Sequence, residues 1–179
     1  GIFSDEYSEI FSLFSPFMNA QTEVSLEANP LNITKDSIQI WKKIGINRLS
    51  IGVQSFSNEI LDFLVRDHSG KDAERSIAMA REAFDNLNLD LIYGIPGQEL
   101  KSFSDDIDSA VKLGINHLSL YNLTFETGTP LGRAFHRGRI KECDIAEEWL
   151  FYKDAMKRLS SYGFDHEEVS NWSRNGYSC

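Results

Sequence analysis

The sequence predicts an α/β fold, namely a partial (β/α) barrel in which parallel strands alternate with helices. Two observations support this prediction. First, short strand-like segments recur along the chain with helix-like segments between them, which is the pattern of right-handed βαβ units. Second, polar residues lie at the C-terminal ends of these segments, and open sheets and barrels bind their ligands at that end. The expected strands cover residues 23–27, 48–54, 88–93 and 117–123.

The second expected strand is the most regular. Between residues 48 and 54, apolar residues alternate with small or polar ones, which is the period of a strand. The apolar set is Leu49, Ile51 and Val53, and the other set is Ser50, Gly52 and Gln54. Ser57 then suits the N-cap of a helix that would run to Arg66. Gln54 at the strand tip and Arg66 near the helix end could therefore reach one site.

Helical periodicity predicts the segments between the strands. The expected helices cover residues 5–18, 34–44, 58–66, 71–84, 102–112 and 144–162. Thr34 suits the N-cap of the second helix, and Gly45 and Gly114 suit helix C-termini. Residues 127–130 are rich in turn formers, and the tail 163–179 has no clear period.

Composition narrows the class of protein. The chain has 179 residues, of which 41% are hydrophobic and 25% charged, so it is an ordinary globular domain or part of a larger one. The formal net charge of -9 argues against a broad nucleic-acid surface. A local basic patch is still possible, formed by Arg133, His136, Arg137, Arg139 and Lys141.

The expected cellular location rests on sequence signals that are not seen. No apolar run approaches the roughly 18 residues of a membrane span, and no signal peptide is visible. The two cysteines, Cys143 and Cys179, form neither a disulfide framework nor a metal-binding motif. We therefore expect a cytoplasmic protein, or one of an organelle matrix if a targeting segment has been lost.

Polar residues at the four strand ends form the candidate site. They are Glu27, Gln54, Asp90, and Asn122 with Thr124. Carboxylates and amides suit a ligand with ribose hydroxyls and an amino group, and no Gly-rich phosphate-binding loop is present. Taken singly, each residue is more often a cap on the next helix. Polar residues at the ends of all four expected strands, taken together, favour a ligand site.

Several blocks of sequence resemble a known family. Residues 26–30, 47–56 and 88–98 resemble the radical S-adenosylmethionine (SAM) enzymes of the oxygen-independent coproporphyrinogen III oxidase family. Residues 118–126, 129–131 and 168–172 resemble its haem-chaperone branch more closely. Arg66-Asp67-His68 resembles the Gly-Arg-x-His segment of that branch, although Val65 replaces the glycine.

The resemblance implies a partial barrel of the radical SAM type, with SAM and a [4Fe-4S] cluster at the C-terminal rim. In members of the oxidase type, Glu27 would contact one SAM molecule. Gln54, Arg66, Asp90 and Thr124 would line a second nucleotide position. These roles are chemically reasonable, because carboxylates accept hydrogen bonds from ribose and a guanidinium pairs with the methionine carboxylate.

The sequence departs from the family at one important point. The cysteine loop that holds the cluster in this family has no counterpart here. Two explanations are open: the chain is a fragment, or it is a degenerate member without the cluster. As a fragment, residues 1–140 would be the central and C-terminal part of the barrel, and residues 141–179 a helix and tail leading into a missing domain. In both cases we expect no radical chemistry from this chain alone.

The resemblance implies two functions for the complete protein. One is a haem-binding chaperone that passes haem to client proteins, with His68 as a possible haem contact. The other is an oxidase that decarboxylates the propionates of coproporphyrinogen III to vinyl groups. For His68 the plainer interpretation is an exposed histidine at a helix end beside Asp67. The expected partners are thus haem or porphyrinogen and a haem-accepting client, without nucleic acid.

Overall fold

A single six-stranded sheet organises the chain. The computed structural model describes residues 4–177, with side chains from residue 9 onward. The strand order is β1-β2-β3-β4-β6-β5, and β1 to β4 pair in parallel with their neighbours in sequence. The strands are β1 Ser25–Ala28, β2 Arg48–Gln54, β3 Asn86–Tyr93, β4 His117–Asn122, β5 Asp165–His166 and β6 Asn171–Ser173. The predicted parallel barrel segment is confirmed.

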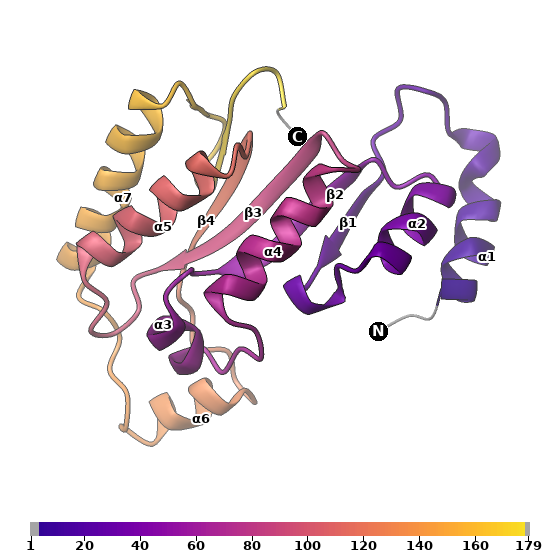
Figure 1. The fold of residues 1–179 in the computed structure, drawn as a ribbon. Helices are drawn as coiled ribbons and strands as arrows, with labels where there is room; N and C mark the ends of the chain where they lie inside the picture. The colour runs from indigo at the N-terminus through magenta and orange to yellow at the C-terminus, as the bar shows by residue number, and fades with distance from the viewer. Residues whose placement is uncertain (1–3, 178–179) are drawn as a thin grey trace.

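Most of the helices connect the strands, and some of them cover one face of the sheet. They are α1 Ser4–Phe14, α2 Lys35–Lys43, α3 Asn58–Phe63, α4 Gly70–Arg81, α5 Leu100–Lys112, α6 Pro130–His136 and α7 Ile145–Ser161, with short 3₁₀ turns at Ser15–Phe17 and Pro30–Asn32. In Figure 1, α4 and α5 cross in front of the strands, while α3 and α6 lie below, near the strands' C-terminal ends.

The main core lies between the sheet and these helices. Leu49, Leu89 and Leu118 point toward the helices from successive strands and are fully buried. Tyr93, Phe103 and Phe151 form an aromatic group there, with the Tyr93–Phe103 ring centroids 5.5 Å apart and the Phe103–Phe151 centroids 5.7 Å apart. Since Phe151, Leu159 and Trp172 belong to the same core, the segment from α7 to β6 is integrated into this sheet layer. That they lead into a further domain stays a prediction.

Local signals explain where two helices begin. Thr34 and Ser37 form a capping box at α2, and Ser69 and Asp72 form another at α4. Gly70 starts α4 because a Cβ at this position would lie 2.1 Å from the Phe56 carbonyl oxygen. The turn before α4 therefore packs directly against the loop that follows β2.

One local expectation was wrong, and two further segments form elements that the sequence did not predict. The helix expected over residues 58–66 ends at Phe63, and Val65 has a positive φ of 56°, so Arg66 lies in the following loop. The turn-rich connection continues into the short helix α6. The tail, which has no clear period, forms β5 and β6, and β6 pairs antiparallel with β4.

Candidate functional site

The face of the sheet opposite the helices carries a continuous chain of polar side chains. Asn88 lies at its centre, and its Nδ2 is within hydrogen-bond distance of Ser50 Oγ at 2.7 Å, of Asp90 Oδ1 at 2.7 Å and of Ser119 Oγ at 2.9 Å. Ser119 Oγ in turn donates to Asn171 Oδ1 at 2.6 Å. The network crosses β2, β3, β4 and β6, so it fixes the orientation of Asp90 from several strands.

Asp90 is the central acidic group of this face. Burial raises the pKa of its carboxyl above the ordinary value, hydrogen bonds from Ser50 and Asn88 oppose this shift, and the negative charge of Glu27 adds to it. Ser50 is the register partner of Glu27 on β1, and its Oγ lies 3.2 Å from Asp90 Oδ1. The carboxylates of Glu27 and Asp90 are thus close enough for the charge of Glu27 to affect the pKa of Asp90.

Gln54 reaches the same face through an irregularity in β2. The register between β2 and β3 shifts between Ile51 and Gln54, and Gln54 has a positive φ of 68°. Its amide lies over Gly52, since a Cβ on Gly52 would come within 2.9 Å of Gln54 Nε2. Glycine at position 52 therefore leaves room for the Gln54 amide beside Ser50.

Asp106 of α5 holds the loop behind Gln54. Ser55 Oγ donates to Asp106 Oδ2 at 2.6 Å, and the Phe56 backbone N–H donates to Asp106 Oδ1 at 2.8 Å. Burial raises the Asp106 pKa to about 6, despite these hydrogen bonds. A buried carboxylate thus stabilises the strained turn that positions Gln54.

Arg66 and Thr124 lie at the rim, where they line a pocket of about 380 Å³. Leu64, Leu123 and Leu131 give the pocket apolar lining, and Ile92 of β3 also lines it. Ile92 lies two residues beyond Asp90 on the same face of β3. The structure thus places Glu27, Gln54 and Asp90 together on the sheet and Arg66 with Thr124 in the adjoining pocket. Their ligand remains a prediction.

His68 lies in a buried environment that differs from the exposed position expected at a helix end. Its side chain is fully buried, and Nε2 donates to the Val53 carbonyl oxygen at 3.1 Å. It is therefore not the exposed histidine expected beside Asp67. The ring joins the loop before α4 to the end of β2. Haem contact stays a prediction that this buried position does not support.

Sequence reasoning missed a second polar group at the opposite end of the same face. Arg48 donates from Nη2 to His117 Nδ1 at 2.6 Å and from Nη1 to Ser25 Oγ at 2.9 Å. Burial, followed by the positive charge of Arg48, lowers the His117 pKa to about 4. The sequence signal that could have revealed this group is the alternation of polar and apolar residues over 86–93 and 117–122. The same alternation occurs in β2.

The described residues do not fit an iron–sulfur cluster. No group of three or more metal-ligating side chains occurs within the part of the chain that the structure describes. Cys143 lies beside Glu147, with its Sγ 3.4 Å from Glu147 Oε2. Burial and this carboxylate raise the pKa of the Cys143 thiol to about 11, which opposes thiolate ligation. Cys179 lies outside the described residues.

The sequence also matches a family model, over a region that includes most of the parallel sheet. The model of the Radical SAM superfamily matches residues 4–110. The chain belongs to the radical SAM superfamily. Members of this superfamily use SAM and a [4Fe-4S] cluster. The match ends within α5, so it covers three of the four parallel strands and the residues Glu27, Gln54 and Asp90.

Relatives of this radical SAM chain include haem chaperones. Heme chaperone HemW of Bacillus subtilis is 35% identical over 156 residues, which cover 87% of this chain and 41% of that protein. The mitochondrial radical S-adenosyl methionine domain-containing protein 1 of the mouse is 37% identical, covering 89% of this chain and 36% of its own length. The chain thus spans about two fifths of the curated relatives it matches. The resemblance to the haem-chaperone branch is confirmed.

A solved structure supports the same architecture. Coproporphyrinogen III oxidase (HemN) from Escherichia coli, a radical SAM enzyme, superimposes with a TM-score of 0.81 and 26% sequence identity. The superposition covers 98% of this chain and 41% of that enzyme. Within residues 4–177, no helix has the length and hydrophobicity needed to cross a bilayer.

Proposed function

We propose that the complete protein binds SAM on the open face of this sheet and acts as a haem chaperone. The observation that carries the SAM site is the meeting of Glu27, Gln54 and Asp90 on one face near the strands' C-terminal ends. The similarity to heme chaperone HemW supports the chaperone function.

The donor and acceptor groups of the face suit the nucleoside part of SAM. Glu27 and Asp90 would accept hydrogen bonds from ribose hydroxyls, and the Gln54 amide can donate and accept. Arg66 would pair with the methionine carboxylate, and Thr124 would contact the same ligand from the other side of the rim pocket. Bound SAM would supply the radical precursor of this superfamily in a protein that also holds the cluster.

The competing function is that of an oxygen-independent coproporphyrinogen III oxidase. It is supported by the structural similarity to HemN over nearly the whole chain. The chaperone is preferred because heme chaperones HemW match at higher sequence identity. We further propose a cytoplasmic or organelle-matrix location, since the relatives include bacterial proteins and a mitochondrial protein.

Two assays on the complete protein separate these functions. Haemin titration followed by Soret absorbance should saturate at one haem per chain. Coproporphyrinogen III, incubated with SAM and a strong reductant, should keep its propionate groups. Formation of vinyl groups would instead assign the oxidase, and absence of both haem binding and conversion would contradict both functions.

The cluster would be held outside the described residues. The 179-residue chain by itself should therefore contain no iron after reconstitution with iron and sulfide, and it should form no 5′-deoxyadenosine from SAM. Iron and sulfide analysis of the isolated chain tests this directly. Four irons per chain would overturn it.

A further inference from the structure

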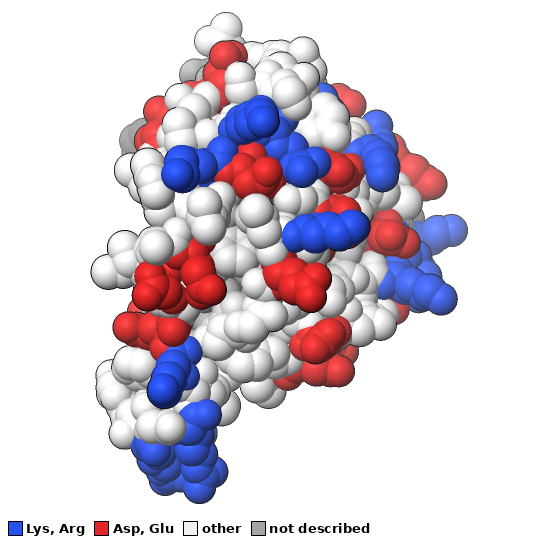
Figure 2. Space-filling view, turned by 90° about the vertical axis from the view of Figure 1, so that its left-hand side faces the viewer, with Lys and Arg blue, Asp and Glu red and all other residues white. Residues whose placement is uncertain are grey.

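The basic residues after β4 form an isolated surface on an acidic protein. We call residues 130–141, which comprise α6 and the five residues after it, the α6 lobe. It contains Arg133, Arg137, Arg139 and Lys141 and no acidic residue, whereas the whole chain has a net charge of -9. All four cations are exposed. Figure 2 shows them gathered at the lower tip of the molecule.

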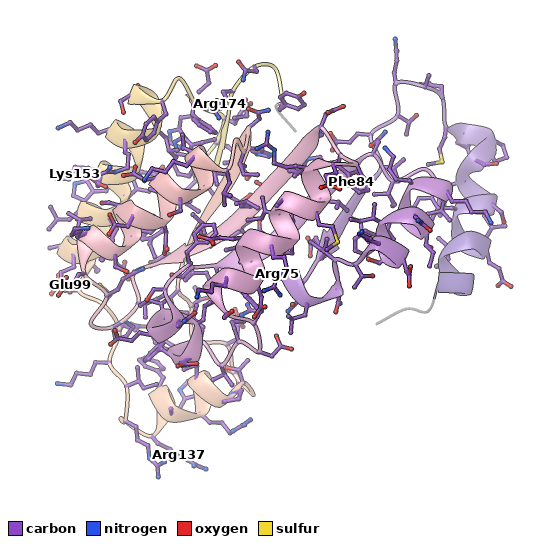
Figure 3. The ribbon with its side chains drawn as sticks, in the orientation of Figure 1. Arg75, Phe84, Glu99, Arg137, Lys153 and Arg174 are labelled. Atoms are coloured by element: carbon purple, nitrogen blue, oxygen red, sulfur yellow. The ribbon has the colours of Figure 1, made fainter. Side chains whose placement is uncertain are left out.

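These cations have no carboxylate partners among the described residues. Six ion pairs occur in that part of the chain, and none involves the lobe. Arg133 donates from Nη1 to the Gly128 carbonyl oxygen. Arg137 extends away from the body of the molecule (Figure 3). The charges are thus available to an external partner.

The lobe is firmly anchored, so its charges are held in place. Leu131 packs against the small apolar cluster of Ile60, Leu64 and Ile95. Gly132 is buried, and a Cβ there would lie 2.0 Å from the Glu126 carbonyl oxygen. This anchoring lowers the entropic cost of binding, because the backbone that carries the cations is already ordered.

Aromatic packing also holds the lobe, and the rim pocket adjoins it. Phe135 stacks on Phe125 with ring centroids 4.8 Å apart and an interplanar angle of 7°. Thr129 caps α6 by accepting a hydrogen bond from the Gly132 N–H at 3.0 Å. Thr129 and Leu131 line the 380 Å³ pocket, so a partner on the lobe would lie beside the pocket mouth.

We propose that the α6 lobe docks a compact acidic surface of a partner protein. Opposite charge attracts such a surface to the lobe, while the acidic remainder of the chain repels it, so the encounter is oriented. A flat anionic membrane or a long phosphate backbone would extend over the acidic remainder and be repelled there. That the partner is a haem acceptor rests on the proposed function. The existence of the docking surface does not depend on that function.

The test uses a short labelled peptide of six glutamates, with binding to the complete protein followed by fluorescence anisotropy. The double variant Arg137→Glu with Arg139→Glu should weaken binding at least tenfold at low salt. Lys112→Glu with Lys157→Glu is the matched control, since both residues are exposed on α5 and α7 and the charge change is the same. The control should weaken binding less than twofold.

Three results would overturn the proposal. The first is equal weakening in both double variants, or no peptide binding at all. The second is lobe-dependent binding to phosphatidylglycerol vesicles without peptide binding, which would indicate a membrane. The third is a salt-sensitive dimer in sedimentation that the lobe variant abolishes, which would assign the lobe to a second copy of the chain. Unchanged haemin binding in the lobe variant would separate failure of docking from failure of the chaperone function.

Discussion

The two faces of the parallel sheet differ in what they contribute. On the face covered by α4 and α5, Leu89 and Leu91 of β3 are fully buried among apolar side chains. On the opposite face, Asn88 and Asp90 of the same strand join a polar network. Since successive side chains of a strand point to opposite faces, one segment of eight residues serves both purposes.

This difference separates stability from ligand chemistry. Apolar burial against the helices supplies a driving force that grows with the area removed from water. The polar face instead buries groups that must remain hydrogen-bonded, and it includes an aspartate and a histidine with shifted pKa values. Such perturbed groups are common at functional sites. Substitutions on the two faces should therefore have different consequences.

The largest effect is expected on the apolar face. Phe103→Ala removes a fully buried ring from the aromatic group with Tyr93 and Phe151. We expect a loss of about 3–5 kcal/mol in the free energy of unfolding, measured with urea. Phe17→Ala, at a residue that is 83% exposed, should change it by less than about 0.5 kcal/mol. Equal effects would contradict the assignment of the core.

The next largest effect concerns His117 and pH. Its pKa is lowered from 6.5 to about 4 in the folded state, so the unfolded chain binds the proton first as the pH falls. Stability should therefore decrease from about pH 6.5 to about pH 4, by at most about 3 kcal/mol.

Unfolding measured in urea at pH 7 and pH 4.5 checks this effect. His117→Gln, which keeps an acceptor for Arg48, should show a smaller loss of stability over this range. Asp106 acts in the opposite direction: its raised pKa of about 6 makes the folded state bind a proton first, which stabilises the protein as the pH falls. Comparing the variant with the unsubstituted protein cancels that contribution. Identical pH profiles would contradict the shifted histidine.

A smaller effect is expected from the centre of the polar network. Asn88→Ala removes the amide that contacts Ser50, Asp90 and Ser119 and should cost about 1–3 kcal/mol in unfolding free energy. Asn32→Ala, at an exposed residue, is the control. If Asn88 orients Asp90, the variant should also shift the pH dependence of SAM binding. A change in stability with an unaltered binding profile would limit Asn88 to a structural role.

The sequence predicted the four parallel strands well because each carries a period-two pattern and ends near a polar residue or a turn. It did not predict α6, since Thr129, Pro130 and Gly132 are typical of turns, although threonine followed by proline also suits a helix start. It also missed β6, whose three residues are specified by pairing with β4 and not by a local pattern.

The candidate site was predictable in part. Its residue types and strand positions could be inferred, because polar side chains at strand ends are visible in the sequence. The bulge and positive φ of Gln54, the burial of His68 and the hydrogen bond from Ser50 to Asp90 depend on contacts between distant segments. Burial of a polar residue is a tertiary property, so residue type alone suggested the wrong surroundings for His68.

Isothermal titration of SAM into the complete protein tests the central claim most directly. Gln54→Ala and Asp90→Ala should each weaken binding by about 1–3 kcal/mol, which is roughly 5- to 150-fold. Asp85→Ala, at an exposed carboxylate beyond the opposite end of β3, should leave the affinity unchanged. Unchanged SAM affinity in both Gln54→Ala and Asp90→Ala would contradict the assignment of the open polar face as the SAM site.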